Sequence, residues 1–163
     1  MTLSNKKYYF LSEEEARFFT ALSILMVPAG TNPVSSPGAL EVGGVNYIDC
    51  TLLAFPKEVQ EYFRGIIKLT NEKSKECYRR EFALLEDADR EFVLKSLFSD
   101  PVTRERAFDL RSLVLEGYYS DYHDPSYNGI TAWEAIKFEG KRISGIKKDW
   151  SFLKIWRDFE KEK

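Results

Sequence analysis

Apolar side chains recur every three or four residues along most of this chain, and no stretch alternates apolar with polar residues as a half-buried strand does. Between residues 12 and 27, for example, Phe19, Leu22 and Met26 fall on one side of a helix. This spacing constrains the fold most, because amphipathic helices are stable only when their apolar sides are buried. It predicts an all-α fold: a single compact array of about five to seven helices with a long ordered aromatic loop and a C-terminal arm.

Local start and stop signals give the expected helix boundaries. Ser12 and Glu15 form a capping box, and Pro56 and Pro101 are suited to the first turn of a helix. Gly117 predicts a left-handed C-cap for the helix before it. The expected helices span residues 12–27, 39–55, 57–76, 84–98, 101–116, 132–136 and 150–161.

Three of these helices carry further predictions. The second contains two glycines, which are poor helix formers, so it starts either at Ala39 or near Asn46, a usable N-cap. The fifth is apolar over most of its last two turns and is expected to lie at the centre, with Phe108 among its buried residues. The residues expected to be buried in the fourth are Phe92, Val93, Leu97 and Phe98.

At 163 residues and 19.0 kDa the chain is expected to form a single domain over residues 1–163. Its parts are an N-terminal arm (1–10), a helical core (11–116) and a final region (117–163). The final region holds the aromatic loop, a short helix and a C-terminal helix.

The net charge is −2, but residues 141–163 hold 8 basic and 4 acidic residues, a local charge of +4. That charge is small and no nucleic-acid-binding motif accompanies it, so no nucleic-acid partner is expected. The longest apolar stretch, Ala21 to Val27, is far too short to span a bilayer, so no membrane span is expected. The amino terminus as written shows no export signal, which favours the cytoplasm.

Side chains for metal binding or nucleophilic catalysis are scarce. The two cysteines, Cys50 and Cys77, and the single histidine, His123, are too few for a zinc site. The cysteines are expected to be buried free thiols, with a disulfide between them as the alternative. For His123 a turn position is the simpler interpretation, and a general base acting on a cysteine is the other. With no phosphate loop or dinucleotide fingerprint, we expect no catalytic, cofactor-binding or metal-binding residue.

Aromatic residues concentrate in the turn-rich stretch from Leu110 to Gly140. Such rings must be covered by the chain's own core or by a partner, and tyrosines are common at interfaces. Thr131 and Glu134 predict a capping box for the short helix that carries Trp133. With two residues of the C-terminal helix, the expected interface residues are Tyr118, Tyr119, Tyr122, Tyr127, Trp133, Ile136, Phe138, Trp150 and Trp156.

The segment EGYYSDYHDPSYNGITAWEAIKFEG, residues 116–140, resembles the C-terminal signature of the gluconate 2-dehydrogenase subunit 3 family. Members typically show a helix ending in G-Y-Y or G-Y-F, a variable loop, then a Trp and an I-G-F-x-G-like segment. This chain has Lys137 in place of the usual glycine. Three upstream segments also resemble the family. The family's first helix resembles FLSEEEARFFTAL, the entry to its second helix resembles PGALEVGGVNYIDCTL, and its fourth helix resembles FALLEDADREFVLKSL.

The resemblance implies a small helical subunit that holds no cofactor. It would bind a large FAD-containing catalytic subunit of the glucose-methanol-choline (GMC) oxidoreductase type, which oxidises a sugar or a sugar acid such as gluconate, and would assist its maturation. A cytochrome c subunit often joins such complexes, and many members carry a twin-arginine signal, which implies the periplasm. The alternative is a stand-alone helical protein-interaction module whose aromatic residues close its own core.

Overall fold

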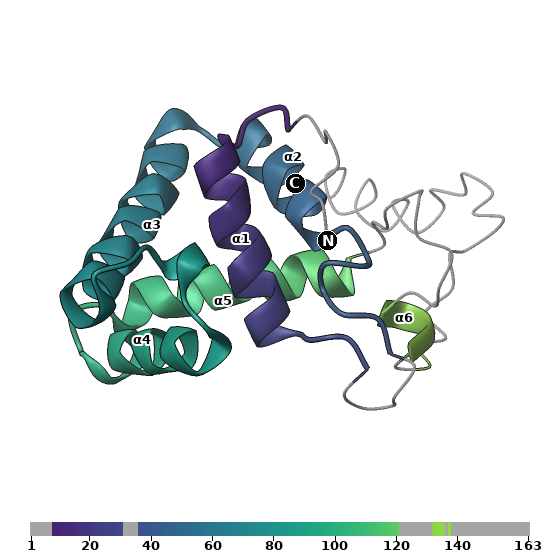
Figure 1. Ribbon diagram of the computed structural model, residues 1–163. Coiled ribbons are helices and arrows are strands. Elements are labelled where there is room, and N and C mark those ends of the chain that lie inside the picture. Colours follow the sequence, from purple (N-terminus) through teal and green to yellow (C-terminus); the bar gives the residue numbers. More distant parts are fainter. Residues whose placement is uncertain (1–7, 31–35, 121–131, 136, 138–163) are drawn as a thin grey trace, which may run out of the picture.

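The computed structural model describes residues 8–30, 36–120, 132–135 and 137. Within these ranges the chain forms helices and no strand, which confirms the all-α prediction. The helix expected over residues 150–161 lies outside them. The elements are α1 (Glu13–Met26), α2 (Gly44–Ala54), α3 (Lys57–Tyr78), the 3-10 helix η1 (Phe82–Leu84), α4 (Asp87–Ser99), α5 (Arg104–Tyr119) and α6 (Ala132–Ala135) (Figure 1).

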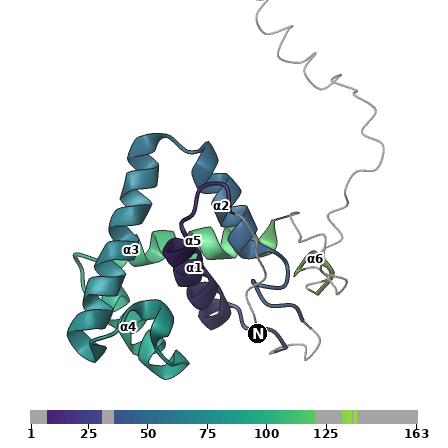
Figure 2. The ribbon, with the colours of Figure 1, turned by 45° about the horizontal axis from the view of Figure 1, so that its top comes forward.

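The other helices pack around α5. Figures 1 and 2 show α5 running across the molecule, with α3 and α4 toward one end and α2 and α6 toward the other, while α1 crosses it. Leu110 and Val114 of α5 are almost completely buried, and so are Ala107 and Leu113. The central position predicted for this helix is therefore confirmed.

α1 begins where the sequence predicts. The Glu15 N–H donates to Ser12 Oγ at 3.2 Å, and the Ser12 N–H donates to Glu15 Oε2 at 2.8 Å, which completes the capping box. Arg64 of α3 donates through Nε to Glu15 Oε1 at 2.9 Å. Burial raises the pKa of Glu15, but the hydrogen bonds from Ser12 and Arg64 outweigh it, so the pKa is lowered overall. The cap therefore also links α1 to α3.

Asp49 ties the segment before α1 to α2. Its side chain is on the buried side of α2 and the residue is only 2% exposed. Oδ1 accepts the N–H groups of Phe10 at 2.9 Å and Leu11 at 2.8 Å, and Oδ2 accepts that of Tyr9 at 2.8 Å. Hydrogen bonds to an ionised carboxylate are strong, so one side chain holds three successive backbone positions. The sequence signal for this contact is a carboxylate on the apolar side of a helix, where it requires partners.

α4 starts at Asp87 rather than at Leu84, which belongs to η1, and the starts of two other helices also differ from the prediction. α2 starts at Gly44, not at Ala39 or Asn46, because residues 39–43 form turns that end with Gly43 in the left-handed conformation (φ 78°). α5 starts at Arg104, since the three residues from Pro101 form a turn before it. The last two differences reflect turns placed between the predicted start signal and the helix.

The prediction that Gly117 ends the fifth helix is wrong. The helix continues to Tyr119, so the helical core extends past residue 116. A β-carbon at position 117 would lie 3.1 Å from the Gly44 carbonyl oxygen and 3.2 Å from Tyr47 Cδ1. Gly117 therefore allows α5 to pack closely on α2, and it does not serve as a left-handed cap.

Some side chains that were expected in the core are exposed. Phe92 is 55% and Phe108 is 45% exposed, so the prediction of their burial is wrong. Leu94 is buried in α4, beside Val93 and Leu97. The two cysteines are free thiols, as expected, but both are exposed.

Candidate partner interface

The two tyrosines that end α5 have different surroundings. Tyr118 is 6% exposed, and its hydroxyl donates to the Pro37 carbonyl at 3.1 Å. Its ring meets that of Tyr119 edge to face, with the ring centres 4.8 Å apart. Tyr118 therefore anchors α5 to the segment before α2 and offers a partner little surface. Tyr119 is 47% exposed and remains available for contact.

α6 is attached to the end of α5 through Trp133. The Trp133 Nε1–H donates to the Tyr119 carbonyl, in the last turn of a helix where carbonyl groups lack partners within the helix. The Trp133 ring is half-buried, while the neighbouring Ala132 is buried. Trp133 is thus joined to the backbone of Tyr119, and both residues are partly exposed; we call these two residues the aromatic corner.

The backbone turns after α6 at Lys137. Lys137 has φ 54°, in the left-handed region, and its N–H donates to the Glu134 carbonyl at 3.1 Å. Glycine adopts this conformation without steric cost, whereas other residues do so at a cost of about 1 kcal/mol. Lys137 therefore lies at a turn whose backbone conformation glycine would adopt at lower cost.

The remaining predicted interface residues lie outside the described residues, so their contacts stay predictions. They are Tyr122, Tyr127, Ile136, Phe138, Trp150 and Trp156. His123 and Thr131, the expected cap of α6, also lie there. Of the nine predicted interface residues, the structure therefore places three together: Tyr118, Tyr119 and Trp133.

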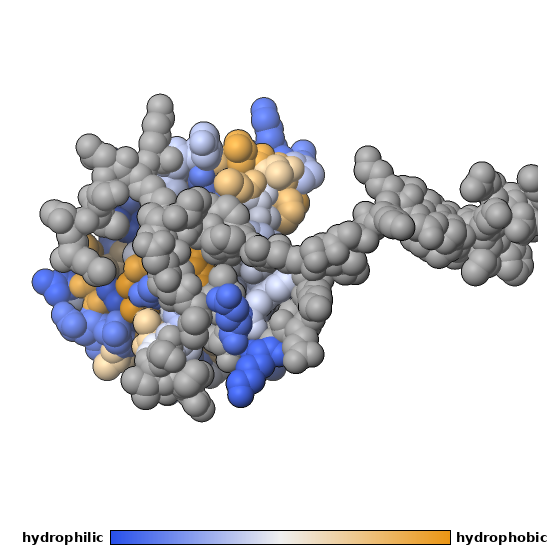
Figure 3. Space-filling model, turned by 90° about the vertical axis from the view of Figure 1, so that its right-hand side faces the viewer, coloured by the Kyte–Doolittle hydropathy of each residue, from blue (hydrophilic) through white to orange (hydrophobic). Residues whose placement is uncertain are grey.

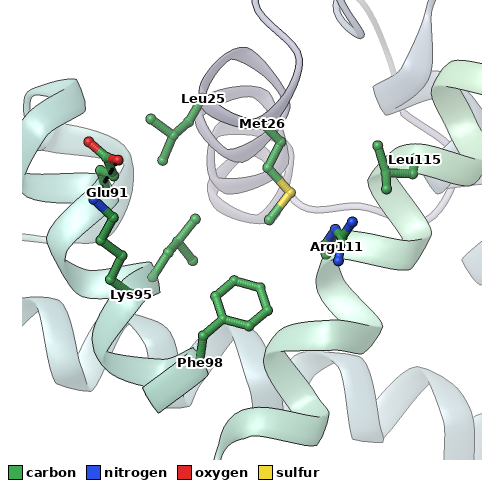
Figure 4. Close-up of a pocket in the computed structure, with 8 residues that line it drawn as sticks. Leu25, Met26, Glu91, Lys95, Phe98, Arg111 and Leu115 are labelled. Carbon is green, nitrogen blue, oxygen red and sulfur yellow. Dashed lines mark ion pairs between the residues drawn. The ribbon is translucent and has the colours of Figure 1, made fainter. Parts of the chain in front are cut away.

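An open groove of about 400 Å³ lies between α1, α4 and α5 (Figure 4). Its apolar lining comes from all three helices: Leu25 and Met26 of α1, Leu94 and Phe98 of α4, and Leu115 of α5. Figure 4 shows Met26 and Phe98 pointing toward each other across the groove. We call this site the α1–α4–α5 groove.

Three charged side chains border the groove, and only two of them pair with each other. Lys95 Nζ lies 2.8 Å from Glu91 Oε1 on the same helix, the pair marked by a dashed line in Figure 4. Arg111, on the opposite wall, has no ion pair or hydrogen bond with any residue that the structure describes. The groove therefore presents an apolar surface beside Arg111, whose charge is unpaired within the described part of the chain.

The groove and the aromatic corner share one side of α5. Phe108, Arg111, Leu115 and Tyr119 are three or four residues apart, which aligns them along the helix. The Phe108 ring rests against that of Phe98, with ring centres 5.2 Å apart. This partly apolar strip was not predicted from the sequence, where its apolar residues were assigned to the core. The available signal was Arg111, a charge within an apolar run.

Figure 3 shows the face of the molecule that lies to the right in Figure 1. Hydrophobic side chains of the described residues reach this surface in patches among hydrophilic ones, notably at its upper edge. No helix in the described part of the chain is both long and apolar enough to cross a membrane. In the same part, no group of three or more His, Cys, Asp and Glu side chains is placed to hold a metal ion.

Comparison with known proteins identifies the family. The model of the family described as gluconate 2-dehydrogenase subunit 3 matches residues 13–140. The matched range begins at the first residue of α1 and includes all the described helices and the aromatic corner. No curated protein and no solved structure matches the chain. Because the family match covers most of the sequence, the chain belongs to the gluconate 2-dehydrogenase subunit 3 family.

Proposed function

We propose that this chain is a non-catalytic small subunit that binds an FAD-dependent dehydrogenase of the GMC type and supports its maturation and stability. The dehydrogenase oxidises a sugar or a sugar acid such as gluconate. The observation that carries the proposal is the family match over residues 13–140, because the family is described as a subunit of gluconate 2-dehydrogenase. A subunit acts through the surface that it presents to its partner.

The exposed surface supports this proposal. The Tyr119 ring is exposed at the end of α5, and the partly exposed Trp133 is hydrogen-bonded to the Tyr119 carbonyl. Aromatic residues are enriched in the cores of protein interfaces. In this proposal the flavin belongs to the large subunit and a cytochrome c subunit completes the complex. This chain contributes binding surface.

Binding alone gives a physical route to support of maturation. A subunit that binds only the folded dehydrogenase stabilises it by mass action, by about 2.7 kcal/mol when its free concentration is 100 times Kd. That is a substantial fraction of the about 5–15 kcal/mol that separates folded from unfolded proteins. A small helical protein therefore needs no chemistry of its own to raise the yield of folded partner.

Co-expression tests the proposal. A GMC-type, FAD-dependent dehydrogenase from the same genome is produced with and without this chain, and the soluble yield, flavin content and thermal stability of the dehydrogenase are measured. The expected result is a stable complex that co-purifies and a higher yield of flavin-loaded enzyme. Equal solubility, stability and activity of the dehydrogenase alone, with no complex, would refute the proposal.

One observation favours the second candidate, a stand-alone helical interaction module. Tyr118, an expected interface residue, is covered by the chain's own Pro37 segment. If the aromatic residues mainly close the chain's own core, the isolated protein should be monomeric, fold cooperatively and bind no dehydrogenase. The co-expression experiment therefore separates the two candidates.

A further inference from the structure

We infer that the α1–α4–α5 groove receives a segment of the dehydrogenase that presents a bulky apolar side chain beside a carboxylate, and that Arg111 binds this carboxylate. The inference rests on the proposed function and names a second contact surface on this chain. It concerns residues on α1, α4 and α5, none of which belongs to the aromatic corner.

The lining of the groove indicates the apolar part of the ligand. Leu25, Met26, Leu94, Phe98 and Leu115 line it, and Phe108 extends its edge. Binding sites of about 300–1,000 Å³ take small molecules or individual side chains, and about 400 Å³ is near the lower end of that range. The groove therefore suits one or two large apolar side chains that protrude from a partner.

The charges indicate the polar part. Glu91 and Lys95 are paired with each other, so they largely cancel at the groove. Arg111 has no partner among the described residues, and a guanidinium binds a carboxylate through two parallel hydrogen bonds. A carboxylate next to the apolar anchor would therefore gain a charge-assisted contact that a neutral or basic segment cannot make.

The same charge argues against two other occupants. Residues 141–163 of this chain include acidic residues beside aromatic ones, but their net charge of +4 makes their overall interaction with Arg111 repulsive. A second copy that offered the same groove would bring two unpaired arginines together, since a two-fold symmetric interface pairs identical surfaces. A partner segment with an acidic residue meets neither difficulty.

The position of the groove fits a single partner that covers both surfaces. Arg111 and Tyr119 are eight residues apart on the same side of α5, or about 12 Å along the helix axis. A dehydrogenase surface that packs on the aromatic corner can therefore reach the groove as well. Both contacts would then belong to one interface of ordinary size.

The first experiment measures the affinity of full-length variants for the purified dehydrogenase. Arg111→Glu should raise Kd about tenfold or more, since it replaces an attractive contact by a repulsive one. Arg106→Glu is the matched control, because Arg106 is exposed on the same helix but does not line the groove, and its Kd should stay within about twofold. Arg111→Lys should give an intermediate loss, because it keeps the charge but not the two-pronged contact.

The second experiment identifies the occupant. The photo-reactive residue p-benzoylphenylalanine replaces Phe108, an exposed ring at the edge of the groove, and the cross-linked peptide is identified by mass spectrometry. A peptide of the dehydrogenase that contains Asp or Glu beside a large apolar residue supports the inference. A peptide from residues 141–163, or from a second copy of the chain, overturns it.

The outcomes also separate this inference from the proposed function. If the unmodified chain forms no complex with the dehydrogenase, the proposed function itself fails. If the unmodified chain binds the dehydrogenase, and Arg111→Glu and Arg106→Glu both bind it with the same Kd as the unmodified chain, only the inference about the groove is wrong. Thermal unfolding of each variant, followed by circular dichroism, confirms that the compared proteins are folded.

Discussion

Gly117 of α5 packs so closely on Gly44 of α2 that little room is left between them for a side chain. A β-carbon at position 117 would lie 3.1 Å from the Gly44 carbonyl oxygen and 3.4 Å from the Gly44 Cα. Gly117→Ala should therefore lower the free energy of unfolding by about 1–2 kcal/mol, although alanine favours a helix over glycine by about 1 kcal/mol. Urea denaturation monitored by circular dichroism measures the change.

Gly65 provides the control for that substitution. It also lies inside a helix, α3, but a β-carbon there would meet no atom within 4 Å. Gly65→Ala should raise the free energy of unfolding by about 0.5–1 kcal/mol. If both substitutions stabilise the protein equally, the packing role of Gly117 is wrong.

The Asp49 carboxylate should be essential for holding residues 9–11. Asp49→Asn removes the charge and turns one acceptor oxygen into a donor, which leaves at least one backbone N–H without its bond. The expected loss is about 2 kcal/mol of unfolding free energy, with faster hydrogen exchange at Tyr9, Phe10 and Leu11. Asp87→Asn, which affects one exposed ion pair, should change stability by about 0.5 kcal/mol at most. If hydrogen exchange at these three amides were unchanged, Asp49 would not hold this segment.

Tyr62 should lose its proton at a higher pH than an ordinary tyrosine does. Partial burial, together with the hydrogen bond that its hydroxyl donates to the Asp109 carboxylate, raises the pKa of Tyr62 to about 12. Because the raised pKa favours the protonated phenol in the folded state, this contribution to stability is complete below about pH 10 and is lost between about pH 10 and 12. The stability difference between the unmodified chain and Tyr62→Phe should shrink over that range. A tyrosinate absorbance titration in which Tyr62→Phe removes a component centred near pH 10 would contradict this expectation.

Ser23 and Ser74 are both fully buried serines, and they should respond oppositely to alanine. The Ser23 hydroxyl has no hydrogen-bond partner among the described residues, so Ser23→Ala should raise the free energy of unfolding by about 1 kcal/mol. The Ser74 hydroxyl donates to the Arg80 carbonyl at 2.7 Å, so Ser74→Ala should lower it by about 1 kcal/mol. Thermal unfolding of the two variants checks both signs. Destabilisation by Ser23→Ala would show that its hydroxyl has a partner.

Trp133 should contribute most to binding at the aromatic corner. Truncation of a well-packed interface tryptophan commonly costs about 2 kcal/mol or more, so Trp133→Ala should raise the Kd for the dehydrogenase about 30-fold. Lys137, two residues after the end of α6, is exposed, so Lys137→Ala should change Kd by about twofold or less. Titration calorimetry on the purified components measures both. If the two variants had similar Kd values, Trp133 would not be an interface residue.

Features that depend on neighbouring residues could be predicted from the sequence. The capping box of α1 involves residues only three positions apart, and the central burial of α5 follows from its apolar content. The short helix that carries Trp133 was also predicted, and it is present as α6. These predictions required no knowledge of which helices meet.

Features that depend on contacts between distant residues could not be predicted from the sequence. Gly117 has the local character of a helix end, but its role is set by Gly44, 73 positions earlier in the chain. Phe92 and Phe108 satisfy the helical spacing of core residues, yet the arrangement of α4 and α5 leaves them at the surface. The α1–α4–α5 groove is assembled from three helices, so no single segment reveals it.

The hydrogen bond from Trp133 to the Tyr119 carbonyl joins two points that are separated by 13 residues of chain. Once both ends of a segment are fixed, doubling its length adds only about 0.6 kcal/mol of closure entropy. A change in the length of the chain between these two residues therefore alters the closure entropy only slightly.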